Sequence, residues 1–271
     1  MFAYYTHNLS PYLIHFSGNI GLRYYGLAYA LGFLGLFVGL RWQAARGWSQ
    51  LRGEAITDFV TWTIAGVIVG GRLGYCLLYS WDVTRHHPLW IFYIWQGGMA
   101  SHGGIIGAIA AIYLCARHRQ IPFYNLADAT ALCCPPALFL GRIANFINGE
   151  LWGRPATVPW AVIFPEAPLV HGLNVPRHPS QIYEALLEGL LLFTIMLIVR
   201  FRSKHDGAVA LTFMAGYPVM RIIGECFREP DLGIGYFWGM VTQGQLLSIA
   251  MLALALVLIV LQFGSRGQQK N

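Results

Sequence analysis

The residues most able to do chemistry lie between Gly141 and Gly153, at the end of an apolar run. This stretch contains the guanidinium of Arg142, the carboxamide of Asn145 and the carboxylate of Glu150. At helical spacing Arg142 and Asn145 share a face, and Glu150 and Gly153 follow where the helix is expected to end. A guanidinium in this setting is suited to hold a phosphate or a carboxylate at the edge of a membrane. The stretch therefore predicts an anion site.

A second polar stripe is expected on a later helix. Tyr217, Arg221 and Glu225 follow one another at intervals of four residues, so a helix places all three on one face. Arg221 and Glu225 could form a purely structural ion pair. Tyr217 adds a third polar group to the same face, which favours a functional role for the stripe.

A histidine, His102, lies within the glycine-rich residues 97–104. Glycines let helices approach closely, and they also weaken a helix. His102 could therefore act as a proton shuttle or base, or it could be a satisfied core histidine within a helix-packing patch. The sequence favours neither interpretation.

Polar residues also cluster at 177–184, before another apolar run. Ser180 is suited to be a helix N-cap with Glu184 in the first turn. Capping does not account for His178 and its other polar neighbours, so the segment either organises the structure or contacts a substrate. Tyr25, in a Tyr-Tyr pair, either belongs to an interfacial aromatic belt or directs its hydroxyl inward.

The elements that position these residues are expected to be membrane helices. The chain has 271 residues, of which 56% are hydrophobic and only 11% are charged, whereas soluble domains average about 25% charged residues. The net charge of +6 comes from dispersed basic residues, which argues against nucleic-acid binding and fits basic loops facing anionic lipid. The composition predicts an all-α polytopic membrane protein and excludes a soluble function.

Seven apolar runs are long enough to span a bilayer. Residues 1–18 contain aromatic residues but no Lys or Arg, which predicts an interfacial arm and no cleavable signal peptide. The proline-rich residues 149–180 predict a small folded head between spans 4 and 5, within a single membrane-embedded domain, 1–271. The predicted spans are 19–40, 56–79, 90–115, 122–148, 181–201, 208–227 and 243–263.

The loop charges predict the orientation. By the positive-inside rule, the side richer in Lys and Arg is cytoplasmic, which places the C-terminus inside and the N-terminus and the head outside. The side predicted to be cytoplasmic carries Arg41, Arg46, Arg52, Arg117, Arg119, Arg200, Arg202, Lys204, Arg266 and Lys270, and the opposite side carries Arg85, Arg154, Arg177 and Arg228.

Four arginines remain within the predicted spans, and the orientation places all of them in the outer half. The nearest candidate carboxylates are Glu225 and Glu150, which leaves an expected excess of positive charge there. Such an excess favours an anion, and the anion most available at that depth is a phospholipid headgroup. The alternative is that the side chains extend to the outer interface, which fits Arg23 best. The four are Arg23, Arg72, Arg142 and Arg221.

Several catalytic motifs are missing from the sequence. It has no aspartate cluster for magnesium, no Gly-x-Ser-x-Gly, no HExxH and no Walker loop. Its five cysteines lack metal-ligand spacing. No metal and no cofactor are therefore predicted.

These residues together resemble one known family, the prolipoprotein diacylglyceryl transferases of the bacterial inner membrane. The stretch from Gly141 to Gly153 is similar to the signature Gly-Arg-x-Ala-Asn-Phe-x-Asn-x-Glu-x-x-Gly. The resemblance covers essentially the whole chain. The other matching blocks, in family order, are Tyr24-Tyr25-Gly26, residues 97–104, residues 177–184, Gly216-Tyr217 with Arg221 and Glu225, and Arg228-Glu229-Pro230-Asp231.

The resemblance implies a fold of seven spans with a periplasmic head. It implies a multi-pass protein of the bacterial inner membrane, with its active site toward the periplasmic leaflet. The implied partners are phosphatidylglycerol, within membrane lipid, and a prolipoprotein signal peptide with a lipobox cysteine. The implied reaction transfers the diacylglyceryl group to the cysteine thiol, forms a thioether and releases glycerol-1-phosphate in the first step of lipoprotein maturation.

The resemblance and the chemistry together assign roles to the residues. Arg142 is expected to hold the phosphate, with Arg221 as a second cationic arm positioned by Glu225 and Tyr217. The thiol must lose a proton, either to His102 or through the field of the arginines. The remaining expected substrate-binding residues are Asn145, Glu150, Gly153, Tyr25 and His178.

Two other classes of function compete with this interpretation. A transporter or channel for an organic anion would also use outer-leaflet arginines and a broken glycine-rich span. A non-catalytic lipid-binding scaffold is the other alternative. The transporter predicts ionisable groups in both halves of the membrane, whereas most of those in this chain are expected in the outer half.

Overall fold

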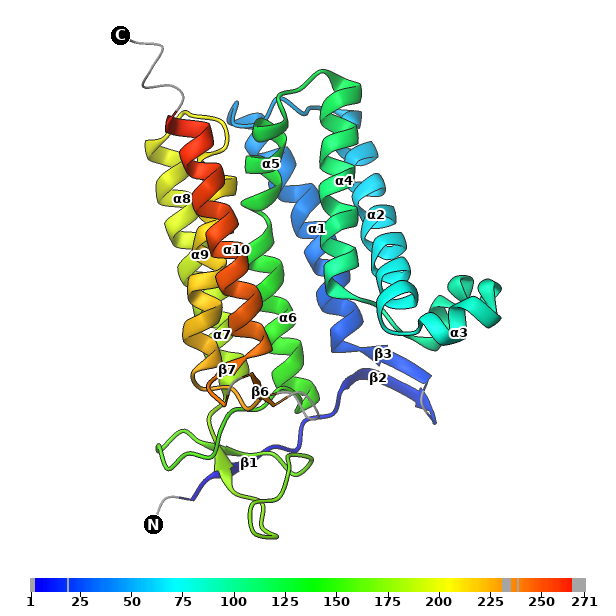
Figure 1. Ribbon diagram of the computed structural model, residues 1–271, viewed down its shortest axis with the longest axis vertical. Helices are drawn as coiled ribbons and strands as arrows, with labels where there is room; N and C mark the ends of the chain where they lie inside the picture. The colour runs from blue at the N-terminus through cyan, green and yellow to red at the C-terminus, as the bar shows by residue number, and fades with distance from the viewer. Residues whose placement is uncertain (1–2, 19, 231–234, 238, 265–271) are drawn as a thin grey trace. The chain divides into compact units, whose positions relative to one another are not determined.

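A computed structural model describes residues 3–18, 20–230, 235–237 and 239–264 of the chain (Figure 1). The described chain forms two compact units, residues 1–35 with 131–271 and residues 36–130, and each unit is described by itself below. Asp231 of the predicted motif and Arg266 and Lys270 of the predicted cytoplasmic tail lie outside the described residues.

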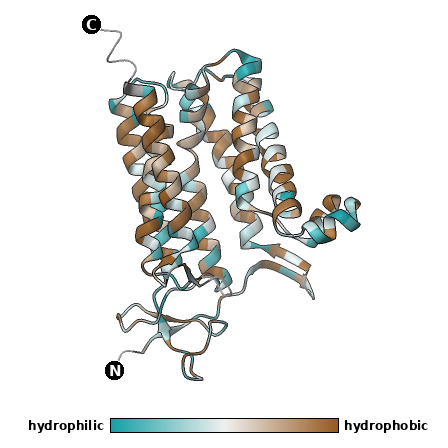
Figure 2. Cartoon of the chain, viewed as in Figure 1, coloured by the Kyte–Doolittle hydropathy of each residue, from teal (hydrophilic) through white to brown (hydrophobic). Residues whose placement is uncertain are grey.

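The described chain is mainly helical. Five of the described helices are long and apolar enough to cross a membrane: Tyr24–Ala45, Glu54–Leu78, Phe123–Asn148, Ser180–Arg202 and Gln243–Gln262. Helices also form over α4 (Ser101–Arg119) and α9 (Ala208–Glu225), where two further spans were predicted. Apolar residues dominate the helical ribbons in Figure 2. The polytopic membrane class is confirmed at this level.

In the unit of residues 36–130, helices α2 (Glu54–Leu78) and α4 pack through glycines. A Cβ built on Gly70 would lie 2.3 Å from the Gly103 carbonyl oxygen, and one on Gly107 would lie 1.9 Å from that of Gly66. Only hydrogen atoms fit between such backbones, so the glycines serve close helix packing. His102, beside them on α4, is exposed.

The third span was predicted to begin at residue 90, but the helix in this region begins later. Residues 81–96 form a short helix, α3 (Trp81–His86), and the 3-10 turns η1 (Pro88–Phe92) and η2 (Ile94–Gln96), and α4 starts only at Ser101. Gly97 and Gly98 both have positive φ, which ends the helical path between the two segments.

The buried Arg72 is held by backbone carbonyls, an arrangement that neither interpretation of the sequence included. Its guanidinium donates to the carbonyl oxygens of Ile91 at 2.9 Å, Trp90 at 2.6 Å, Gly97 at 2.5 Å and Gly98 at 3.2 Å. Four backbone carbonyls thus compensate this buried charge.

The other unit contains a bundle of helices with extensive neighbour contacts (Figure 1). Helix α6 (Cys134–Asn148), which follows α5 (Phe123–Ala131), packs on the π-helix η3 (Ala185–Leu191). Gly189 of η3 permits this contact, because a Cβ there would lie 2.6 Å from Cβ of Phe139. The segment η3 joins α7 (Ser180–Glu184) to α8 (Leu192–Arg202). Helix α9 packs between α8 and α10 (Gln243–Ile259), which continues into η4 (Val260–Gly264).

The predicted head is a small folded structure that includes part of the N-terminal arm. Its sheet has the order β1-β4-β5, with β1 (Tyr5–Thr6) parallel to β4 (Val162–Ile163), and β4 antiparallel to β5 (Pro176–Arg177). Phe164, Val162 and Ala167 form its core against Phe146 and Trp152. The arm is therefore not interfacial throughout, because its first strand is part of the head.

Two hairpins complete this unit. Strand β2 (Tyr12–Ser17) pairs with β3 (Ile20–Arg23), which leads directly into α1 (Tyr24–Ala45). Strand β6 (Tyr236–Phe237) pairs with β7 (Val241–Thr242), and Thr242 caps α10 through a capping box with Gln245.

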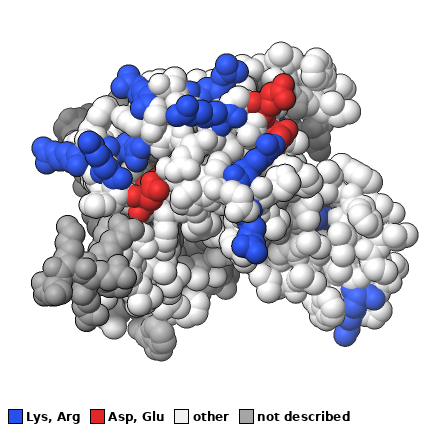
Figure 3. All heavy atoms as spheres, turned by 90° about the horizontal axis from the view of Figure 1, so that it is seen from above, with Lys and Arg blue, Asp and Glu red and all other residues white. Residues whose placement is uncertain are grey.

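Figure 3 shows Lys and Arg side chains gathered on the face that it draws.

Candidate active site

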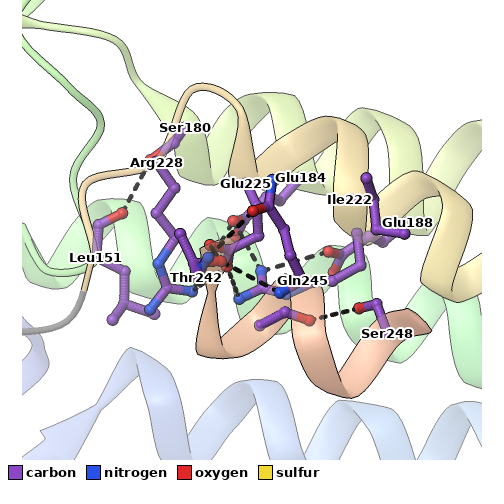
Figure 4. Close-up of polar contacts among 12 residues, drawn as sticks. Leu151, Ser180, Glu184, Glu188, Ile222, Glu225, Arg228, Thr242, Gln245 and Ser248 are labelled. Atoms are coloured by element: carbon purple, nitrogen blue, oxygen red, sulfur yellow. Dashed lines mark hydrogen bonds and ion pairs between the residues drawn. The ribbon is translucent and has the colours of Figure 1, made fainter. Parts of the chain in front are cut away.

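Two buried carboxylates, one helical turn apart, organise the polar interior of the bundle. Glu184 ends α7 and Glu188 lies in the π-helix η3, and neither side chain is exposed to solvent. A buried carboxylate is costly unless it is paired, so each must have cationic partners. Figure 4 shows both residues among the polar contacts that join these helices to α9 and α10.

Arg142 on α6 binds both carboxylates. Its Nε and Nη2 donate to Oε2 of Glu188 at 3.0 and 2.9 Å, and its Nη1 lies 2.9 Å from Oε2 of Glu184. The two contacts with one carboxylate oxygen fix the plane of the guanidinium. The side chain of Arg142 is 13% exposed, so the group is held inside the protein with a small accessible surface.

Arg221 on α9 approaches the same carboxylates. Its Nη1 donates to Oε1 of Glu184 at 2.8 Å and lies 3.5 Å from Oε1 of Glu188. Its Nη2 donates to Glu225, so the ion pair that their spacing allows is present. Glu225 also accepts a hydrogen bond of 2.8 Å from the Thr242 hydroxyl.

Arg228 completes a cluster of six side chains, called here the arginine–glutamate cluster: Arg142, Arg221, Arg228, Glu184, Glu188 and Glu225. Arg228 Nη1 lies 3.9 Å from Glu184 and 3.8 Å from Glu225. With three arginines and three ionised glutamates, these six side chains carry no net charge. For Arg142 and Arg221 the expected excess of positive charge is therefore wrong, because Glu184 and Glu188 were not counted there. Their spacing within an apolar run was the signal that could have identified them.

The rest of the signature surrounds the end of α6. Asn145 and Asn148 donate to Oε1 of Glu150 at 2.7 and 3.3 Å, while Gln181 donates to the Glu150 carbonyl at 2.5 Å. Glu150 is therefore held by carboxamides. Gly149, with φ of 68°, ends the helix in the left-handed conformation that glycine favours.

Gly153 occupies a position with no room for a side chain. A Cβ there would lie 2.3 Å from the His178 carbonyl oxygen and 2.7 Å from that of Phe227. Its own N–H donates to the His178 carbonyl at 3.0 Å. The last signature glycine thus joins the head to the end of α9.

Ser180 is not an N-cap. The cap position is Pro179, without a side-chain cap bond, and the Ser180 hydroxyl donates instead to the Leu151 carbonyl at 2.9 Å. His178 packs against Tyr183 and Phe227, and its Nδ1 lies 3.1 Å from the Tyr183 hydroxyl. Burial lowers the pKa of His178 below its usual 6.5, because the charged imidazole loses solvation.

The two tyrosines predicted for the site both interact with its charges. Tyr217 interacts electrostatically with both Arg142 and Arg221, and its ring stacks on Phe213. Tyr25, near the start of α1, is half-exposed, pairs with Tyr29 and interacts electrostatically with Glu150 and Arg142. His102 belongs to the other compact unit, so its role stays a prediction.

The cluster is suited to binding an anion and stabilising negative charge. Its guanidinium groups are fixed before any ligand arrives, and a dry site strengthens their effect on a developing charge. Within the described parts of the chain, no group of three or more His, Cys, Asp or Glu side chains is arranged to hold a metal ion.

Comparison with known proteins identifies the family. A family model described as prolipoprotein diacylglyceryl transferase matches residues 11–261. A protein of Idiomarina loihiensis is 47% identical over 254 residues, covering 93% of this chain and 92% of its own length. One of Geobacter sulfurreducens is 46% identical over 244 residues, covering 90% and 92%. Both relatives are named phosphatidylglycerol–prolipoprotein diacylglyceryl transferase. This chain belongs to the prolipoprotein diacylglyceryl transferase family.

Proposed function

We propose that this protein transfers the diacylglyceryl group of phosphatidylglycerol to the lipobox cysteine thiol of a prolipoprotein. The observation that carries the proposal is the match over residues 11–261 to a family whose relatives bear that name. The buried arginines beside the signature agree with it, because the substrate is a phosphodiester anion. The product is a thioether, and glycerol-1-phosphate leaves.

The proposed reaction forms one carbon–sulfur bond and breaks one carbon–oxygen bond. The thiol loses a proton, its sulfur forms a bond to the terminal glycerol carbon of the diacylglyceryl group, and the bond from that carbon to the phosphate oxygen breaks. The electron pair of the broken bond stays on the phosphate, which becomes a monoester. Cations near that oxygen therefore lower the barrier.

Arg142 is the residue proposed to hold the phosphate, with Arg221 as the second cationic arm. Glu184, Glu188 and Glu225 position these two guanidiniums through the contacts described above. The other proposed substrate-binding residues are Asn145, Glu150, Gly153, Tyr25, Tyr217 and His178.

Two sources for the thiolate remain in the proposal. His102 could accept the thiol proton, or the arginines could favour the thiolate directly. The transfer rate of His102→Gln distinguishes them, because loss of a base reduces the rate at neutral pH far more than loss of a supporting residue.

The proposed topology has seven spans, with α4 and α9 crossing the membrane beside the five apolar helices. The chain forms a single membrane-embedded domain, 1–271, with an N-terminal arm (1–18) and a head (149–180). The protein lies in the bacterial inner membrane with its N-terminus, head and active site on the periplasmic side and its C-terminus in the cytoplasm. The distribution of Lys and Arg in the loops supports this orientation. Labelling of single cysteines in the head and in the loop at 203–207 of intact cells tests it.

The test of function is transfer of labelled glycerol from phosphatidylglycerol to a lipobox peptide by purified protein. Wild type is expected to transfer label, and Arg142→Ala to lose transfer while remaining folded by circular dichroism. Retained transfer by Arg142→Ala would overturn the phosphate assignment. If folded wild type fails with both substrates present, the protein is better explained as an organic-anion transporter.

A further inference from the structure

The arginine that follows the signature, Arg154, is fixed beside the arginine–glutamate cluster by uncharged groups. Its Nε donates to the Arg228 carbonyl at 3.0 Å and its Nη2 to the Glu225 carbonyl at 3.4 Å. The guanidinium also lies over the Tyr236 ring, 5.7 Å from its centroid. These contacts place its charge at the end of α9, next to two members of the cluster.

The backbone of Arg154 is fixed from both sides. Its N–H donates to the Phe227 carbonyl at 2.9 Å, and its carbonyl accepts from the His178 N–H at 3.0 Å. Both its backbone and its side chain are thus positioned without a ligand. Binding of an anion would therefore require little further loss of conformational entropy from Arg154.

Arg154 differs from its neighbours in how its charge is compensated. The three cluster arginines are balanced by three glutamates, and the buried Arg177 pairs with Glu229 at 3.1 Å. Among the described residues, no carboxylate forms an ion pair with Arg154. Its positive charge is therefore available to a ligand, whereas that of the cluster is already matched.

Arg23 offers an informative contrast. It also pairs with no carboxylate among the described residues, but it is exposed and held by the Tyr12 hydroxyl at 2.8 Å on the β2–β3 hairpin. It makes none of the contacts that fix Arg154 to α9. Arg23 therefore serves as a matched control for loss of one unpaired positive charge.

The proposed reaction needs such a charge. The reaction converts a phosphodiester with one negative charge into a phosphate monoester with more negative charge. The added negative charge develops on the oxygen that leaves the diacylglyceryl carbon. A neutral cluster can bind an anion, but it has no net charge to offset the increase. A guanidinium with free N–H groups can contact a phosphate through two hydrogen bonds.

We propose that Arg154 contacts the phosphate and binds the leaving phosphate monoester more strongly than the intact lipid. This inference rests on the proposed function and adds a phosphate-contacting residue to it. The same chemistry would allow Arg154 to bind the diester headgroup, so the two ligands must be separated by experiment.

The experiment compares wild type with Arg154→Gln, Arg154→Lys and Arg23→Gln in the transfer assay. It measures kcat, the KM for phosphatidylglycerol and the inhibition constant of glycerol-1-phosphate. For Arg154→Gln we expect kcat to fall by about tenfold to a hundredfold, and inhibition to weaken by a similar factor. The KM for lipid should change little. Arg154→Lys should recover part of kcat, since it restores the charge but not the two-pronged contact, and Arg23→Gln should match wild type.

Unchanged kcat and unchanged inhibition in folded Arg154→Gln would overturn the inference while wild type still transfers. A raised KM with unchanged inhibition would also overturn it, in favour of a contact with the lipid diester. Absence of transfer by wild type would instead refute the proposed function. If Arg154→Gln does not fold, the inhibition constant of Arg154→Lys decides, with an unchanged value refuting the inference.

Discussion

Glu188→Gln offers the most direct test of the arginine–glutamate cluster. The side chain of Glu188 is fully buried and accepts from Arg142 at 2.9 and 3.0 Å, with Arg221 at 3.5 Å. The substitution preserves the shape of the side chain but removes its charge. It leaves the six side chains with one uncompensated positive charge in a dry interior.

Breaking a buried ion pair in this way costs about 3–5 kcal/mol. On the scale of folded domains, where each kcal/mol lowers the unfolding midpoint by about 2–4 °C, we expect a fall of about 6–20 °C. Thermal unfolding in detergent, followed by circular dichroism, measures this shift. Transfer activity should fall as well, because two of the three contacts of Arg142 with the cluster carboxylates would then be made to an uncharged acceptor.

Two further variants make the test specific. Asp58→Asn removes a carboxylate that is 55% exposed and pairs with Arg119, itself 40% exposed, so its cost should stay below about 1 kcal/mol. The double variant Glu188→Gln with Arg142→Gln restores neutrality and should be more stable than the sum of its single changes implies. An unfolding midpoint of Glu188→Gln within about 2 °C of wild type would refute the proposed charge balance.

Three other outcomes are expected. Gly153→Ala should lower both stability and transfer, because its Cβ would lie 2.3 Å from the His178 carbonyl oxygen; thermal unfolding beside the transfer assay checks this, and a wild-type midpoint would contradict it. Thr242→Val should cost about 1–2 kcal/mol through loss of the α10 cap and of a hydrogen bond to Glu225, measured by the same unfolding assay. Burial lowers the pKa of His178 below 6.5, so the unfolded chain takes up a proton more readily and stability falls as the pH drops below about 6.5. His178→Asn should remove that part of the pH dependence, and an unchanged dependence of the unfolding midpoint on pH would argue against it.

Local spacing in the sequence was sufficient to predict several features of the bundle. Apolar runs predicted the long helices, and proline density predicted a segment without a long helix at 149–180, where the short strands β4 and β5 form. The interval between Arg221 and Glu225 predicted that both side chains share one helix face, and there they form an ion pair. These features depend on neighbours along the chain, for which the helical repeat fixes the geometry.

Features that depend on distant parts of the chain appeared only in the tertiary structure. Local rules favoured a cap at Ser180 with Glu184 in its first turn, but burial against α6 and α9 pairs Glu184 with Arg142 and Arg221 instead. Arg72 similarly meets carbonyls that follow it by about twenty residues. A buried charge pairs with whichever opposite charge or carbonyl the packing brings close. The sequence determined which charges lie in the apolar helices, and only the fold decided which of them neutralise one another.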